Sequence, residues 1–217
     1  MKKTEISAFI SLPNLFTIIN ALLGLFAIYF IIKNNLVLSA RMVLIAIFFD
    51  SFDGFLARKS NNIAEFGKSL DSLSDIISFG VVPAFVFIIS SENILSLPIG
   101  FLYVIFGLLR LSRFNTLNSD EYVGLPITLG AIFVILLFLS GIPPTLNAIF
   151  VFITSILFIS SFRLRRPSRR GKSLAMFSSI FILISLIPYP MIEILSRLLL
   201  FVLPTIFILY LFRYPQS

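Results

Sequence analysis

Long apolar runs, separated by short polar segments, dominate this chain. The uncharged or nearly uncharged stretches cover about residues 12–32, 36–57, 71–90, 95–109, 125–141, 145–162, 174–190 and 192–212. Several approach the ~20 residues that a helix needs to cross the hydrocarbon core of a bilayer. Backbone polar groups in lipid must be satisfied internally, and no alternating pattern typical of a barrel is present. The pattern therefore predicts an all-α, polytopic transmembrane helical bundle with about eight spans.

Composition agrees with this class. Of the 217 residues, 58% are hydrophobic and 12% are charged, whereas a soluble domain carries about 25% charged residues. So few charges could not cover so much apolar surface in water. The composition indicates an integral membrane protein and excludes a disordered chain, a coiled coil and a secreted disulfide scaffold.

The chain contains no Cys and no His. Disulfides, thiol nucleophiles and Cys-based zinc sites are therefore excluded, and the commonest general base is missing. Any chemistry must come from carboxylates, hydroxyls, Lys or Arg. A metal site built from carboxylates would favour a hard ion such as Mg²⁺ or Mn²⁺.

The net charge of +7 suits either nucleic acid or a membrane surface, and its distribution favours the membrane. With eight spans and a cytoplasmic N-terminus, 14 of the 17 Lys and Arg residues fall on inner segments, and only Lys33, Arg41 and Arg197 do not. The positive-inside rule then predicts a multi-pass cell-membrane protein with both termini in the cytoplasm. No motif supports a nucleic-acid partner. The densest basic cluster, Arg163–Lys172, is expected in a cytoplasmic loop, where it serves topology and lipid anchoring or grips an anion.

Four of the ten acidic residues lie at the inner ends of two neighbouring spans. Asp50 and Asp53 close the second span, and Asp71 and Asp75 open the third. Their i, i+3 and i, i+4 spacings put each pair on one helix face. The two spans are antiparallel and joined by the short basic segment 58–70, so we expect the four carboxylates to meet. Because four like charges repel, one or two divalent metal ions are the natural counter-charge.

Small residues accompany the carboxylates. Gly54 and Ala57 lie in the same sector as Asp50 and Asp53, and Gly67 shares a side with Asp71 and Asp75. Small residues in membrane helices usually permit close helix packing. Here they could instead leave room for a flat ligand beside the metal, and both alternatives stay open.

Taken together, residues 50–75 read Asp50-Ser-Phe-Asp53-Gly54-Phe-Leu-Ala57-Arg58, then eight residues to Gly67, Asp71 and Asp75. This stretch resembles the motif of the class I CDP-alcohol phosphotransferases, D-x2-D-G-x2-A-R-x8-G-x3-D-x3-D, at all eight defining positions. The first span, with Pro13, Asn14, Thr17 and Asn20, resembles the N-terminal helix of this family. Segments 70–84, 109–115 and 124–128 are similar to its phosphatidylserine synthase branch. The resemblance covers roughly residues 13–130.

The resemblance implies a transferase that moves a phosphatidyl-type group from a CDP-linked membrane lipid, CDP-diacylglycerol or CDP-archaeol, to the hydroxyl of L-serine and releases CMP. The same resemblance implies two bound Mg²⁺ or Mn²⁺ ions, whose ligands are Asp50, Asp53, Asp71 and Asp75. It also implies that Asp75 is the general base. Residues expected to contact the CDP-lipid are Gly54, Ala57, Arg58, Gly67 and Lys68. A homodimer is implied by the resemblance only.

The expected organisation is a single integral membrane domain over residues 1–217, with its active site on the cytoplasmic side. Catalytic core helices at 12–130 belong to a six-helix family core, and 145–217 supplies the additional C-terminal helices. Ester-linked and ether-linked lipid donors are not distinguished, because lipid tails meet only generic apolar surface.

Four polar residues outside the motif are candidates for binding serine or the donor phosphates. The serine carboxylate suits a guanidinium group, and Arg110 and Arg113 stand at the inner end of the fourth span. Asn115 and Thr128 could bind polar parts of either substrate. The alternative for the two arginines is ordinary cytoplasmic topology.

Two other functions remain alternatives. One is an enzyme of the same family that uses inositol phosphate, glycerol phosphate or another alcohol as acceptor. The other is a cation transporter, which predicts carboxylates near mid-membrane on several helices. Clustering of the four Asp residues at the inner ends of only two spans disfavours the transporter.

Overall fold

The computed structural model describes residues 11–60, 65–91, 93–116, 121–161, 163–165, 187–188, 191–199 and 202. These residues are almost entirely helical, which confirms the predicted all-α class. They group into two compact units, one holding the described residues up to Val82 and the other those from Pro83 onward. Each unit is described separately, and the single domain expected from the sequence stays a prediction.

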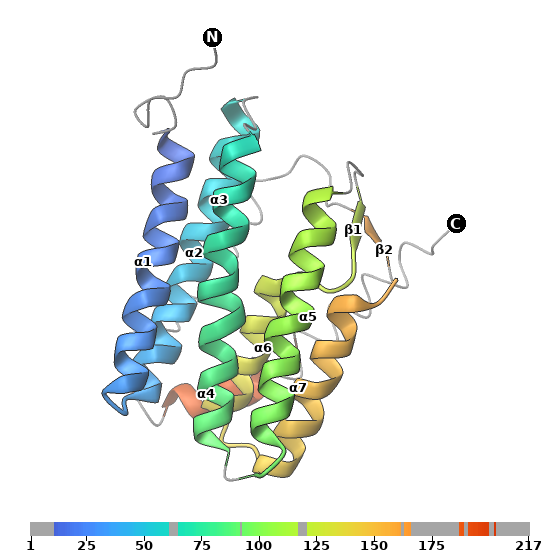
Figure 1. Ribbon diagram of the computed structural model, residues 1–217. Coiled ribbons are helices and arrows are strands. Elements are labelled where there is room, and N and C mark those ends of the chain that lie inside the picture. Colours follow the sequence, from blue (N-terminus) through green and yellow to red (C-terminus); the bar gives the residue numbers. More distant parts are fainter. Residues whose placement is uncertain are drawn as a thin grey trace. The chain divides into compact units, whose positions relative to one another are not determined.

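The first unit begins with a helical hairpin of α1 (Leu12–Ile32) and α2 (Leu36–Ser60) (Figure 1). Ser11 caps α1, because its hydroxyl oxygen accepts from the amide of Asn14 at 3.4 Å. The hairpin turn uses Asn34 at φ 56°, a left-handed conformation that Asn tolerates better than most residues. Asn35 then starts α2, since its Oδ1 atom accepts from the amide of Leu38 at 3.1 Å.

The third predicted span is one continuous helix over Glu65–Ser90. It consists of α3 (Glu65–Asp75), the π-helical segment η2 (Ile76–Val81) and α4 (Val82–Ser90), of which α4 from Pro83 belongs to the second unit. The helix begins at Glu65, whereas the apolar stretch that predicted this span begins at about residue 71. The reason is that loss of hydropathy marks where a helix leaves the apolar layer, not where the helix itself begins.

Helix α1 packs closely against α3 and η2. Ser74 donates from Oγ to the carbonyl oxygen of Thr17 at 3.0 Å, and Ser78 donates to that of Asn20 at 2.9 Å. A Cβ atom at Gly24 would lie 2.5 Å from Ser78 Oγ, so only glycine permits this approach. The two serine bonds fix the register of α3 and η2 along α1.

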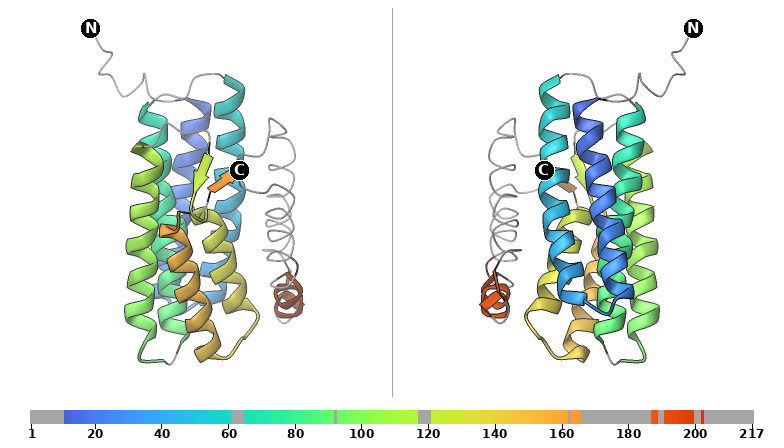
Figure 2. Two further views of the ribbon diagram at one scale, coloured as in Figure 1. Left: turned by 90° about the vertical axis from the view of Figure 1, so that its right-hand side faces the viewer. Right: turned by 90° about the vertical axis from the view of Figure 1, so that its left-hand side faces the viewer.

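The second unit is built on α5 (Ser96–Thr116), α6 (Ile127–Leu139) and α7 (Pro144–Ile159), which Figure 2 shows side by side. Its core includes Tyr103 and Phe158, both fully buried, whose rings meet edge-to-face at 5.0 Å between centroids. Helix α5 extends well past residue 109, the predicted end of the fourth span. Residues 191–199 are also helical.

Two short strands, not predicted from the sequence, form an antiparallel ribbon in this unit. β1 (Glu121–Val123) pairs with β2 (Arg163–Arg165), and Tyr122 lies opposite Leu164. Strands of three residues are too short to leave a periodic pattern. The ribbon places the start of the Arg163–Lys172 cluster in a strand; the rest of the cluster lies outside the described residues.

Three of the described helices are long and apolar enough to cross a membrane: Leu12–Ile32, Glu65–Ser90 and Ser96–Thr116. Helices α6 and α7 are apolar but shorter. The predicted span 174–190, except 187–188, and most of the span 192–212 lie outside the described residues. The membrane class is thus supported, and the number of eight spans stays a prediction.

Candidate metal and substrate site

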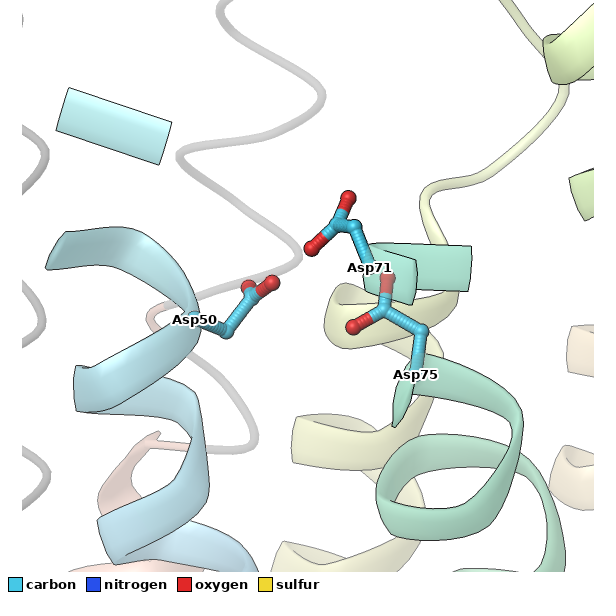
Figure 3. Close-up of side chains that lie close together, drawn as sticks. All are labelled: Asp50, Asp71 and Asp75. Carbon is cyan, nitrogen blue, oxygen red and sulfur yellow. The ribbon is translucent and has the colours of Figure 1, made fainter. Parts of the chain in front are cut away.

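Three of the four predicted carboxylates come together. Asp50 is supplied by α2, and Asp71 and Asp75 by consecutive turns of α3. Each offers one oxygen atom, and these atoms all lie within 4.8 Å of one another. Figure 3 shows the three carboxylates gathered between the two helices. Asp75 is buried with 6% exposure, whereas Asp50 and Asp71 are half-buried.

This cluster has a clear electrostatic requirement. At such separations two carboxylates repel by about 3–4 kcal/mol at an effective dielectric constant of 20. Oxygen atoms are the ligands that hard divalent cations prefer, and Mg²⁺ is commonly held by a few carboxylates together with substrate phosphates and water. The donor set and its spacing therefore fit a divalent ion.

The other predicted residues of the motif lie on the same two helices. Gly54 is half-buried on α2, and Lys68 is half-buried on α3. A Cβ atom at Gly67 would lie 3.0 Å from Asn14 Oδ1, so α1 approaches α3 closely at this point. Asp53, Ala57 and Arg58 belong to α2, but their side chains lie outside the described part of the structure.

An amide that is not among the predicted site residues lies beside the carboxylate cluster. Asn20 on α1 is fully buried, and its Nδ2 atom donates to Asp75 Oδ1 at 3.4 Å. The available signal was its helical spacing from Asn14 and Thr17, which also fits ordinary interhelical hydrogen bonding. Only the contact between α1 and α3 shows which group the amide meets.

Arg113, expected to bind serine or phosphate, is engaged in backbone contacts. Its Nη2 atom donates to the carbonyl oxygens of Val123 at 2.9 Å, Phe158 at 3.1 Å and Ser160 at 3.2 Å, and Nη1 donates to that of Ile159 at 3.4 Å. The last carbonyls of a helix lack partners within the helix. Arg113 thus caps the C-terminal end of α7 and ties it to β1.

The remaining residues predicted for serine binding are found in the same unit as Arg113. Arg110 is buried on α5, with its guanidinium carbon 5.4 Å from the ring centroid of Phe114. Asn115 lies in the last turn of α5, and Thr128 in the first turn of α6; both are half-buried. Their proposed contacts with a substrate stay predictions.

Comparisons with known proteins bear on the same part of the chain. An archaetidylserine synthase of Methanothermobacter thermautotrophicus is 37% identical over 182 residues, covering 81% of this chain and 78% of the relative. A CDP-diacylglycerol–serine O-phosphatidyltransferase of Helicobacter pylori is 31% identical over 199 residues, covering 85% and 84%. One of the same name from Methanocaldococcus jannaschii is 37% identical over 131 residues, covering 60% and 62%.

The family model for CDP-alcohol phosphatidyltransferases matches residues 10–161. This range contains helices α1 to α7, and with them the converging carboxylates of α2 and α3. The motif at residues 50–75, the arrangement of its carboxylates and the match over most of the chain agree, and they establish that this chain belongs to the CDP-alcohol phosphatidyltransferase family of transferases.

Proposed function

We propose that this protein transfers the phosphatidyl or archaetidyl group of a CDP-linked membrane lipid to the hydroxyl of L-serine and releases CMP. The observation that carries the proposal is the convergence of Asp50, Asp71 and Asp75 within a complete family motif. Choice of serine as acceptor is supported by the names of the relatives, an archaetidylserine synthase and serine O-phosphatidyltransferases. Because those names include both lipid types, the donor is proposed only as CDP-diacylglycerol or CDP-archaeol.

The carboxylate cluster is proposed to hold two Mg²⁺ or Mn²⁺ ions through Asp50, Asp53, Asp71 and Asp75. Divalent ions held by these carboxylates would supply positive charge that offsets the charge of the donor phosphates and of the leaving CMP. Gly54, Ala57, Arg58, Gly67 and Lys68 are proposed to contact the CDP-lipid.

Asp75 is proposed as the general base. In the reaction, the serine hydroxyl oxygen bonds to the lipid-side phosphorus, the bond from that phosphorus to the CMP oxygen breaks, and the hydroxyl proton passes to Asp75. With no His in the chain, a carboxylate is the remaining candidate for this proton transfer. Burial of Asp75 deep in the cluster supports its choice over the half-buried Asp50 and Asp71.

The proposed topology has eight spans with both termini in the cytoplasm and the active site on that side of the cell membrane. The β1–β2 ribbon supports the two spans proposed at α6 and α7. Two paired strands lie on one side of a membrane, and these two helices lie between them in the chain.

A second contact supports the seventh span. Arg197 donates from Nε to the carbonyl oxygen of Ser140 at 2.8 Å, so these residues lie on the same side. Helix α7 lies between them in the chain, which supports the proposal of a further span at residues 174–190. Arg197 also pairs with Glu193 at 2.6 Å, which reduces the positive charge that this topology places outside.

Two points of organisation belong to the same proposal. Residues 1–217 are proposed to form one membrane domain, with core helices at 12–130 and additional helices at 145–217.

The residues proposed to lie near the serine carboxylate and the donor phosphates are Arg110, Arg113, Asn115 and Thr128. Of these, Arg113 also caps α7. Homodimer formation stays an expectation from the family.

A panel of acceptors tests the proposed function. Purified protein is supplied with Mg²⁺ or Mn²⁺ and either CDP-diacylglycerol or CDP-archaeol, and CMP release is measured with L-serine, inositol phosphate, glycerol phosphate or buffer. We expect L-serine to raise CMP release at least tenfold over buffer and over each other acceptor. If serine gives no more CMP than buffer while another acceptor does, the serine assignment fails and the family assignment stands.

A further inference from the structure

Asn20 on α1 and Asp75 on α3 form a buried contact at the carboxylate cluster. Asn20 Nδ2 donates to Asp75 Oδ1 at 3.4 Å, and both residues are buried. A carboxylate only accepts hydrogen bonds, so the amide must turn its NH₂ group, not its oxygen, toward Asp75. A hydrogen bond from α1 therefore holds one oxygen atom of the Asp75 carboxylate.

The backbone around this contact is fixed on both sides. Ser74 donates to the carbonyl oxygen of Thr17 at 3.0 Å, and Ser78 donates to that of Asn20 itself at 2.9 Å. Asp75 lies between these two serines in the chain. The two serine hydrogen bonds therefore fix the position of Asn20 relative to Asp75.

Packing alone does not explain an amide at this position. Among the atoms that the structure describes, Asn20 Oδ1 is buried and has no hydrogen-bond partner. A buried acceptor without a partner costs free energy that an apolar side chain of similar size would avoid. What the amide supplies, and Leu would not, is the hydrogen bond to Asp75.

We propose that Asn20 is a positioning residue, which holds Oδ1 of Asp75 and thereby prevents the carboxylate from turning both of its oxygens toward one bound ion. The inference rests on the proposed function, because it takes the cluster to bind a divalent ion and Asp75 to act on the serine hydroxyl. A carboxylate held in this way keeps its orientation toward the acceptor during turnover.

This role has a consequence that does not depend on catalysis. Ca²⁺ takes six to eight oxygen ligands and readily accepts both oxygens of one carboxylate, whereas Mg²⁺ demands near-octahedral geometry and Mn²⁺ prefers a similar one. Loss of the Asn20 hydrogen bond should therefore favour Ca²⁺ over Mn²⁺.

The test uses purified full-length protein with Asn20→Leu, which removes the amide at similar size. The matched control is Ser74→Ala, which removes a neighbouring hydrogen bond between α1 and α3 that does not involve Asp75. The ratio of Ca²⁺ to Mn²⁺ affinity is measured by competition, with free Mn²⁺ followed by electron paramagnetic resonance. We expect this ratio to rise about tenfold in Asn20→Leu and to stay within about twofold of wild type in Ser74→Ala, in line with effects of residues that support metal ligands.

Kinetics provide the second readout. In Asn20→Leu we expect kcat with serine to fall by about 10- to 100-fold, with KM for serine little changed. Should Asn20→Leu fail to fold, Asn20→Thr replaces it, since the shorter hydroxyl does not extend as far as the amide, and the same ratio and kcat are expected. Wild-type values in the folded Asn20 variant, or equal changes in Ser74→Ala, overturn the inference.

These outcomes separate the inference from the proposed function. A wild-type protein that binds divalent ions but releases no CMP with serine removes the serine assignment, and the ion ratio still decides the role of Asn20. A wild-type protein that binds neither Mn²⁺ nor Ca²⁺ overturns both.

Discussion

Arg113 donates from Nη2 to the carbonyl oxygen of Phe158 at 3.1 Å. This bond joins the C-terminal end of α5 to the last turn of α7, and the same guanidinium group also donates to the carbonyl oxygens of Val123, Ile159 and Ser160. A positive charge at the C-terminal end of a helix is favourable as well, because it interacts with the helix dipole. One side chain thus organises the helix ends around the β1–β2 ribbon.

Replacing Arg113 tests this structural role. Arg113→Lys keeps the charge but loses the planar group that donates to several carbonyl oxygens at once. We expect the free energy of unfolding to fall by about 1–3 kcal/mol, and the unfolding temperature to fall with it. Stability is measured as the temperature at which detergent-solubilised protein loses its monodisperse elution peak. A variant of unchanged stability whose KM for serine is strongly raised would indicate a direct substrate contact instead.

Gly124 is expected to tolerate no side chain. Its φ is +77°, and a Cβ atom there would lie 2.3 Å from the carbonyl oxygen of Phe158 and 2.7 Å from Arg113 Nη2. Gly124→Ala should therefore destabilise the protein by more than the ~1–2 kcal/mol of the left-handed conformation alone.

Gly141 supplies the matched control for this variant. It also has a positive φ, of 62°, but the nearest atom to its Cβ position is 3.4 Å away. Gly141→Ala should show the conformational cost without the collision. Equal losses of stability in the two variants would contradict the close approach of Gly124 to α7.

A double-mutant cycle tests the contact between α1 and η2. Gly24→Ala should destabilise the protein, because the added Cβ atom would approach Ser78 Oγ to 2.5 Å. Ser78→Ala alone loses the hydrogen bond to the carbonyl oxygen of Asn20, which is worth about 1 kcal/mol. In the Gly24→Ala background the same substitution should lower the stability by less, or even raise it, because it removes the Oγ atom that the added Cβ atom would meet. Additive losses would argue against direct contact at this position.

The convergence of Asp50, Asp71 and Asp75 could be predicted from the sequence because its information is local. The spacings of Asp50 and Asp53 and of Asp71 and Asp75 define helix faces, and a short connection brings the two helix ends together. The contacts of Arg113 were not predictable, since its partners lie 10 to 47 residues away and are backbone oxygens, which any residue type supplies.

Helix boundaries at the polar ends were misplaced for a different reason. Apolar runs report the part of a helix that faces lipid or core, so the polar first turns of α3 and the last turns of α5 were left out. The π-helical segment after Asp75 left no pattern in residues 76–81, because one inserted residue does not alter an apolar run.

Chelation tests the proposed requirement for metal. Excess EDTA should abolish serine-dependent CMP release, and added Mg²⁺ or Mn²⁺ should restore it, because the carboxylate cluster needs a counter-charge that also binds the donor phosphates. In Asp71→Asn, restoration should require a higher concentration of the ion. Full activity in EDTA would contradict a metal-dependent site.

The central claim is that Asp75 accepts the serine proton during transfer, and one measurement tests it most directly. The initial rate of CMP release from CDP-lipid with saturating L-serine is compared between wild type and an Asp75→Asn variant of equal monodispersity and thermal stability. We predict a loss of about 100-fold or more, the usual contribution of a general base. An Asp75→Asn protein that releases CMP at the wild-type rate would contradict the claim.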